Sequence, residues 1–270
     1  RAISYELLHV CKQSGARLGV LHTPHGDIHT PAFVGAATRA TVKALTMQEM
    51  RDLGSQAILA NTYHLVLRPG TELIKEAGGL AEFCSWHGPT FTDSGGFQIF
   101  SLPNVKITER GVKFKSHIDG AMLEMTPESS MQAQWAIGAD IHMAFDHLAK
   151  SENYADMKVA MERTHAWLDR CVAEHQRLKE SAVSAGGLAG GTPAARRRTA
   201  PRTVGESATT GPAPEQPEKS IFGQDPLCYG QYLYAVVQGG VFNDLRAARQ
   251  SQLAAAPAIE RIALCENILQ

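Results

Sequence analysis

The sequence predicts an α/β fold with a mostly parallel sheet, and two observations support this prediction. Short apolar runs alternate along the chain with segments of helical periodicity, beginning with a predicted strand at residues 56–64. Polar residues directly follow several of these runs, as they do at the carboxyl ends of parallel strands, where α/β proteins form their sites. The pattern alone does not distinguish a barrel from an open doubly wound sheet.

The composition suits a soluble protein with a substantial core, since 44% of the 270 residues are hydrophobic. The formal net charge of -1 provides no global attraction to nucleic acid, so such a partner would have to bind a local patch. Five scattered cysteines without a C-x-x-C pair argue against a disulfide scaffold or a complete local zinc site and fit a reducing, cytosolic compartment. No apolar run reaches the roughly 18 residues of a transmembrane helix.

In the first part of the chain, turn residues and caps delimit the elements. Thr46 and Glu49 form a capping box that predicts a helix over Thr46–Leu53. The remaining expectations are a β-hairpin leading into a strand within 15–37, a strand at 56–64, a helix at 72–79 and a strand at 89–96.

The second part continues the alternation after a two-stranded ribbon at 105–120, which turns at Gly111. A helix opens at Thr126 and Pro127. The further predicted elements are a strand at 140–146, an amphipathic helix at 157–178, a strand at 233–240 and a helix at 243–253.

Residues 181–220 interrupt this pattern, because 28 of these 40 residues are Ala, Gly, Pro, Ser or Thr. Such a composition cannot form a core, so we expect a disordered insertion. The expected organisation is therefore a first part at 1–180, the insertion at 181–220 and a continuation of the sheet at 221–270.

Three predicted strand ends carry polar groups that would share one cavity if the strands are neighbours. The first holds Asp93, Ser94, Gly95, Gly96, Phe97 and Gln98; the second holds Asp146; and the third holds Gln238, Gly239 and Gly240. Paired carboxylates can divide acid, base and nucleophilic roles at a glycosidic carbon. A carboxylate with an amide can also read a purine edge while an aromatic ring stacks on the base. The alternatives are an ordinary turn at Asp-Ser-Gly-Gly and a helix cap at Asp146.

Six ordered strings resemble the tRNA-guanine transglycosylases, also called queuine tRNA-ribosyltransferases. They are TPAFV with TVKAL, NTYHL-x-LRPG, TDSGGFQ, GVKFKSHIDG, ERTHAWLDRC and VVQGG. The resemblance covers most of the chain outside 181–220. It implies a modified (β/α)8 TIM-type barrel, of which about the first five βα units are present in this chain.

The resemblance also implies roles for the strand-end residues. Asp93 matches the general acid/base, and Phe97 matches the ring that stacks on the base. Asp146 and Gln238 match the groups that read the base edge, with Gly239 beside the latter. The string WLDRCVAEHQR resembles the eukaryotic-type catalytic subunit most, which favours queuine as the incoming base. The other implied contacts are base binding by Ser94, Gly95 and Gly96 and support of the ribose and nucleophile by Asn61 and Gln98.

The implied reaction replaces the wobble guanine of tRNAs with G-U-N anticodons through a covalent ribosyl-enzyme. The resemblance further implies a heterodimer with a non-catalytic homologous subunit, a cytoplasmic location with association at the mitochondrial outer surface, and Zn²⁺ in the complete protein. The family's nucleophile phrase, like D-C-V-x-P-T-R, and its Cys-x-Cys-x-x-Cys zinc cluster do not occur in these 270 residues. We therefore expect a chain truncated on its C-terminal side and inactive by itself.

Two other functions remain open from the sequence. One is a non-catalytic protein that binds tRNA or pairs with an active subunit. The other is an unrelated (β/α)8 glycosidase, which rests on the pair of acids alone.

Overall fold

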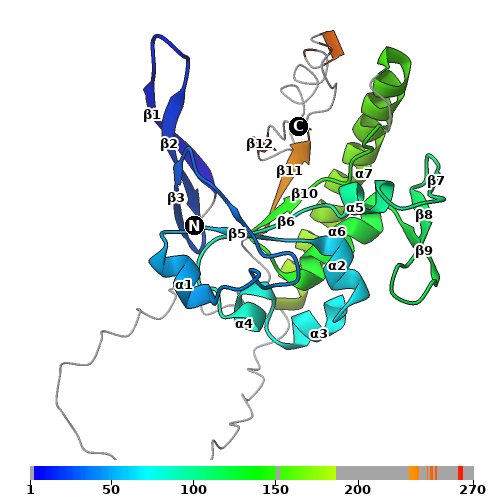
Figure 1. The fold of residues 1–270 in the computed structure, drawn as a ribbon, viewed down its shortest axis with the longest axis horizontal. Helices are drawn as coiled ribbons and strands as arrows, with labels where there is room; N and C mark the ends of the chain where they lie inside the picture. Colours follow the sequence, from blue (N-terminus) through cyan, green and yellow to red (C-terminus); the bar gives the residue numbers. More distant parts are fainter. Residues whose placement is uncertain are drawn as a thin grey trace, which may run out of the picture.

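The computed structural model describes residues 3–149, 153–186, 231–236 and 261–263, together with residues 242, 244, 245 and 247. At its centre lies a six-stranded parallel sheet (Figure 1). In chain order its strands are β4 (Gly35–Ala36), β5 (Ile58–Ala60), β6 (Thr90–Thr92), β10 (Ile141–Met143), β11 (Tyr232–Val236) and β12 (Arg261–Ala263).

The spatial order of these strands is the same as their order in the sequence. A doubly wound sheet reverses its strand order at a switch point, and this sheet has no such reversal among its described strands. The arrangement is therefore singly wound, as it is in a barrel.

The described helices connect and cover these strands. They are α1 (Met47–Asp52), α2 (Thr62–Leu67), α3 (Thr71–Glu76), α4 (Leu80–Cys84), α5 (Gly96–Phe100), α6 (Pro127–Ile137) and α7 (Tyr154–Gly186). Capping boxes at Thr46 and Thr126 fix the starts of α1 and α6, as the sequence predicts for the former. In Figure 1, α2, α3, α6 and α7 lie on the right of the strands.

Two small antiparallel sheets flank the parallel one (Figure 1). The first contains β1 (Ser4–Val10), β2 (Arg17–Thr23) and β3 (Gly26–Thr30). The second is a ribbon of β7 (Lys106–Ile107), β8 (Val112–Lys115) and β9 (Met122–Met125). The predicted hairpin and ribbon are thus confirmed, and each gains a third strand.

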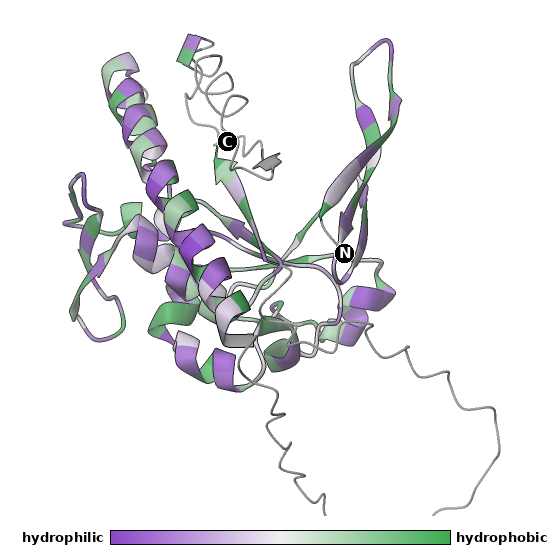
Figure 2. Ribbon diagram, turned by 180° about the vertical axis from the view of Figure 1, so that it is seen from behind, coloured by the Kyte–Doolittle hydropathy of each residue, from purple (hydrophilic) through white to green (hydrophobic). Residues whose placement is uncertain are grey.

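Both faces of the parallel sheet are buried, which explains its apolar strands. On one face Phe91 and Ile141 pack in a cluster with Ile28 of β3. On the other face Phe145 and Leu233 belong to a cluster that includes residues of α7. In Figure 2, hydrophilic and hydrophobic segments alternate along α7, as expected of an amphipathic helix.

Several sequence predictions need correction, among them the strands predicted at 89–96 and 140–146, which end at Thr92 and Met143. The strand predicted at 56–64 ends at Ala60, because the Asn61 side chain accepts a hydrogen bond from His64 N and caps helix α2. The insertion predicted at 181–220 begins too early, since α7 continues to Gly186. Ser181 and Ser184 donate to carbonyl oxygens one turn earlier, which satisfies both hydroxyls within the helix. Residues 187–220 lie outside the described part of the chain.

The sequence also did not predict β1, α4 or β12. Of the helix predicted at 243–253, residues 244, 245 and 247 are described, and they are helical. Within the described ranges, no helix has both the length and the apolar character required to cross a membrane.

Candidate active site

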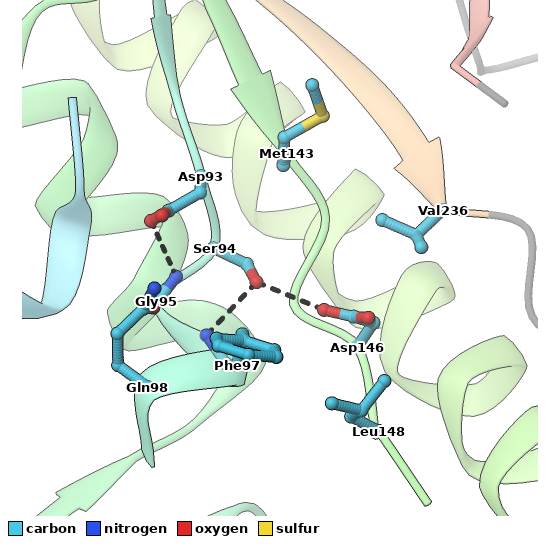
Figure 3. A pocket seen from close by; sticks show the side chains of 10 residues that line it. Asp93, Ser94, Gly95, Phe97, Gln98, Met143, Asp146, Leu148 and Val236 are labelled. Atoms are coloured by element: carbon cyan, nitrogen blue, oxygen red, sulfur yellow. Dashed lines mark hydrogen bonds between the residues drawn. The ribbon is translucent and has the colours of Figure 1, made fainter. Parts of the chain in front are cut away.

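A cavity of about 110 Å³ opens at the carboxyl ends of β6, β10 and β11 (Figure 3). Most of its lining comes from the two acidic strand ends that the sequence predicts to meet. The lining residues are Asp93, Ser94, Gly95, Gly96, Phe97, Gln98, Met143, Asp146, Leu148 and Val236. Gln238 and Gly239 lie outside the described residues, although Val236 of the same strand lines the cavity.

Asp93 is held by three donors to its carboxylate. Asn61 Nδ2 donates to Oδ2 at 2.5 Å, and the backbone N–H groups of Thr62 and Gly95 each donate to Oδ1 at 3.0 Å. The Thr62 hydroxyl also donates to the Asp93 carbonyl oxygen at 2.6 Å. The start of helix α2 therefore orients the acid, and Asn61 contacts Asp93 directly.

Burial raises the pKa of Asp93 to about 6, although the hydrogen bonds from Thr62, Gly95 and Asn61 oppose this shift and the negative charge of Asp146 adds to it. A carboxyl group with this pKa exchanges its proton close to neutral pH. It can therefore act both as an acid and as a base in one reaction cycle.

Asp146 is joined to the first strand end through Ser94. The Ser94 hydroxyl donates to Asp146 Oδ1 at 3.1 Å and accepts from Gly96 N at 3.2 Å (Figure 3). The hydroxyl thus connects the two acidic strand ends. The backbone beside Asp146 is fixed by α7, because His147 N donates to Thr164 Oγ1 and Phe145 N donates to Cys171 Sγ.

The two glycines of the first strand end are required by close contacts. Gly95 has a φ of 78°, and a Cβ there would lie 3.0 Å from Tyr63 N. A Cβ on Gly96 would lie 3.2 Å from Asp146 Oδ1. Gly96 therefore allows the close approach of the two acidic strand ends, whereas Gly95 allows the close approach of Tyr63 at the start of helix α2.

Phe97 and Gln98 present groups that remain available for a ligand. The Phe97 side chain is 52% exposed although it lines a cavity. Gln98 Oε1 is buried and has no hydrogen-bond partner among the described residues, which is costly unless a ligand or water supplies a donor. A flat ring with N–H groups would satisfy both.

The sequence did not single out Thr62, Met143, Leu148 or Val236, which either hold Asp93 or line the cavity. Thr62 could have been found from the Asn61 cap, because a helix beginning there turns its first N–H groups toward the preceding strand ends. The three apolar lining residues carry no chemical signature in the sequence.

The zinc site that the family resemblance implies is not formed by the described residues. Among them, no group of three or more His, Cys, Asp or Glu side chains could hold a metal ion. The chemical groups that this part of the chain brings to the cavity are carboxylates, an amide, a hydroxyl and an aromatic ring.

The fold and site together define a class of protein. It is a singly wound α/β protein with two carboxylates and an exposed aromatic ring at the carboxyl end of its parallel sheet. Such a site is suited to a flat heterocycle and to the bond that joins it to a sugar.

The family model described as "Queuine tRNA-ribosyltransferase" matches residues 11–213. The chain belongs to this family. A protein named queuine tRNA-ribosyltransferase from Shouchella clausii is 52% identical over 184 residues, which are 67% of this chain and 48% of that protein. Proteins of the same name from Halalkalibacterium halodurans and Staphylococcus aureus are 51% and 50% identical over the same shares.

The recognition made from the six sequence strings is thus confirmed, and the interpretation as an unrelated glycosidase is set aside. The chain spans about half the length of these curated relatives.

Proposed function

We propose that the protein acts in tRNA base exchange, replacing the wobble guanine of tRNAs with G-U-N anticodons by a 7-deazaguanine base, with queuine as the incoming base. The observation that carries this proposal is the shared cavity of Asp93 and Asp146, which contains the exposed ring of Phe97. Family membership and the names of the relatives support the same reaction.

In the proposed first half-reaction, the flipped guanine stacks on Phe97 and its N–H edge donates to Asp146. A carboxylate forms a bond to ribose C1′ while the bond between C1′ and guanine N9 breaks and its electron pair goes to guanine. Protonated Asp93 gives its proton to the leaving base. In the second half, ionised Asp93 takes a proton from the incoming base, which displaces the enzyme carboxylate from C1′.

The attacking carboxylate belongs, by resemblance, to a phrase that these 270 residues do not contain. We further propose that the described strands form part of a (β/α)8 barrel and that the complete protein pairs with a non-catalytic homologous subunit of eukaryotic type. The zinc ion, the cytoplasmic location and the association with the mitochondrial surface stay predictions.

The proposal is tested by incorporation of labelled guanine into tRNA by the complete gene product and its Asp93→Asn variant. We expect incorporation into a tRNA with a G-U-N anticodon and none when its wobble guanine is replaced. Loss of general acid/base catalysis should slow the variant about 100-fold or more.

Exposed His87 provides a matched control, and His87→Gln should retain full exchange. Exchange at the wild-type rate in Asp93→Asn would remove Asp93 from the mechanism. Tight tRNA binding without any exchange by the wild type would favour the non-catalytic alternative.

A further inference from the structure

The ladder between β6 and β10 stops just before the two acids. Its register pairs only Ile141 with Phe91 and His142 with Thr92. Beyond this point each strand bonds to its outer neighbour, because Asp93 N donates to Ala60 O of β5 and Ala144 N donates to Tyr234 O of β11. A gap therefore opens between the two strands where the site begins.

The side chain of Gln134 on α6 fills this gap and is fully buried. Its Oε1 accepts from Thr92 Oγ1 and from Met143 N, both at 2.9 Å. Its Nε2 donates to Met143 O at 2.9 Å and to Ser130 Oγ at 3.1 Å. All four hydrogen-bonding positions of the amide are used, and the side chain links the Met143 backbone of one strand to the Thr92 hydroxyl of the other.

Ser130 of α6 makes a further hydrogen bond, to the residue that follows Asp93. Ser130 lies one turn before Gln134, is itself fully buried, and donates to Ser94 O at 3.0 Å. Gln134 and Ser130 together bond to the residues on both sides of Asp93 and to Met143, three residues before Asp146. Their partners Ser94 and Met143 line the cavity, whereas Gln134 and Ser130 are not among its lining residues.

We propose that Gln134 is a positioning residue that sets the separation of the Asp93 and Asp146 carboxylates. It acts through Thr92 and Met143 and touches neither substrate nor reacting atoms. The expected effect of Gln134 on the reaction rate rests on the proposed function. A misplacement of about 1 Å of catalytic groups can cost about 100-fold in rate.

The test compares Gln134→Met, which preserves side-chain length and removes all four bonds, with Gln132→Met on the same helix. Gln132 is a matched control because it also bonds through Nε2, at 2.7 Å, but its partner is Glu174 on α7, away from the site. Two quantities are measured in the complete gene product: steady-state guanine exchange, and the titration of the ¹³C-labelled Asp93 carboxyl by NMR.

We expect Gln134→Met to lower kcat about 100-fold with a smaller change in KM, in line with displaced catalytic groups. The Asp93 titration midpoint should fall, because water enters between the separated strands and favours the charged form. Gln132→Met should match the wild type in both measurements. The proposal is overturned if Gln134→Met keeps the wild-type kcat and midpoint, or if Gln132→Met changes both equally.

If Gln134→Met does not fold, the variant Thr92→Val tests the proposal in its place. This variant removes one hydrogen bond to Gln134 with little change of side-chain shape. It should move kcat and the midpoint in the same directions by smaller amounts, and no change in either would refute the proposal. If the wild type performs no exchange, the proposed function fails, while the NMR midpoints of the same variants still decide the role of Gln134.

Discussion

Asp93 is subject to opposing influences that together place its proton exchange near neutral pH. Burial disfavours its charged form, whereas the donors from Asn61, Thr62 and Gly95 stabilise that form. The net result is a pKa of about 6, above the ordinary aspartate value of about 3.9. The same residue can then serve both halves of the proposed exchange.

The pH dependence of the two half-reactions should therefore have opposite signs. Guanine release requires protonated Asp93, so kcat/KM for tRNA should fall as pH rises through about 6. Capture of the incoming base requires ionised Asp93, so kcat/KM for that base should rise over the same interval. Ping-pong kinetics at a series of pH values measures both quantities, and parallel profiles would contradict the dual role.

At the residue scale, the sequence predicted the acids, the aromatic ring and a supporting role for Asn61, but it missed Thr62 and Gln134. Asp93, Asp146 and Phe97 are recognisable because polar or aromatic residues at strand ends suggest chemistry. The contact of Gln134 with both strands was not predictable, since a glutamine inside a helix looks like a surface residue until its partners are known.

At the element scale, helices α6 and α7 hold the backbone of the two acidic strand ends, and α2 holds the Asp93 carboxylate. Helix α6 bonds to Thr92 and Ser94, on either side of Asp93. Helix α7 bonds to the backbone on either side of Asp146 through Cys171 and Thr164. The packing of α6 against α7 therefore contributes to how the two acids face each other.

The amino ends of the strands are joined to the first antiparallel sheet by a charged contact. His25 Nδ1 lies 2.5 Å from Asp140 Oδ1, and the buried Asp140 also accepts from Thr90 N and Oγ1. The hydrogen bond with Asp140 raises the pKa of His25 above its usual value, against the effect of burial. This contact fastens the turn between β2 and β3 to the start of β10.

This pair should make the protein less stable as pH rises. A histidine with a raised folded pKa contributes stability that is complete below its unfolded pKa of about 6.5 and is lost as pH rises through the folded pKa. Relative to His25→Gln, the wild-type free energy of unfolding should thus decrease from pH 6 to pH 9. Denaturant titrations at both pH values measure it, with His87→Gln as control. A constant difference between wild type and His25→Gln would contradict the expectation.

Helices that begin at a capping box were well predicted, and short elements were not. The capping box at Thr46 located α1, whereas the three-residue strand β5 was predicted too long because the predicted strand included Asn61, which instead caps α2. Strand β12 contains only Arg261–Ala263, which is too short for a periodic signal. Its place beside β11 is a tertiary pairing that the local sequence does not encode.

At the scale of the whole molecule, the parallel sheet gathers residues that are distant in sequence. Asp93, Asp146 and Val236 follow or end three neighbouring strands and line one cavity. The sequence predicted a parallel sheet without distinguishing its winding, and the sequential strand order now favours the singly wound form. Function at this scale depends on three strand ends remaining aligned.

The most direct test of the proposed base pocket is the position of guanine in a crystal of the complete gene product. We predict a purine in the cavity, with its ring against Phe97, its N–H edge toward Asp146 and N9 near Asp93. Guanine ordered at a different site, or a cavity that stays empty at saturating guanine, would contradict this prediction.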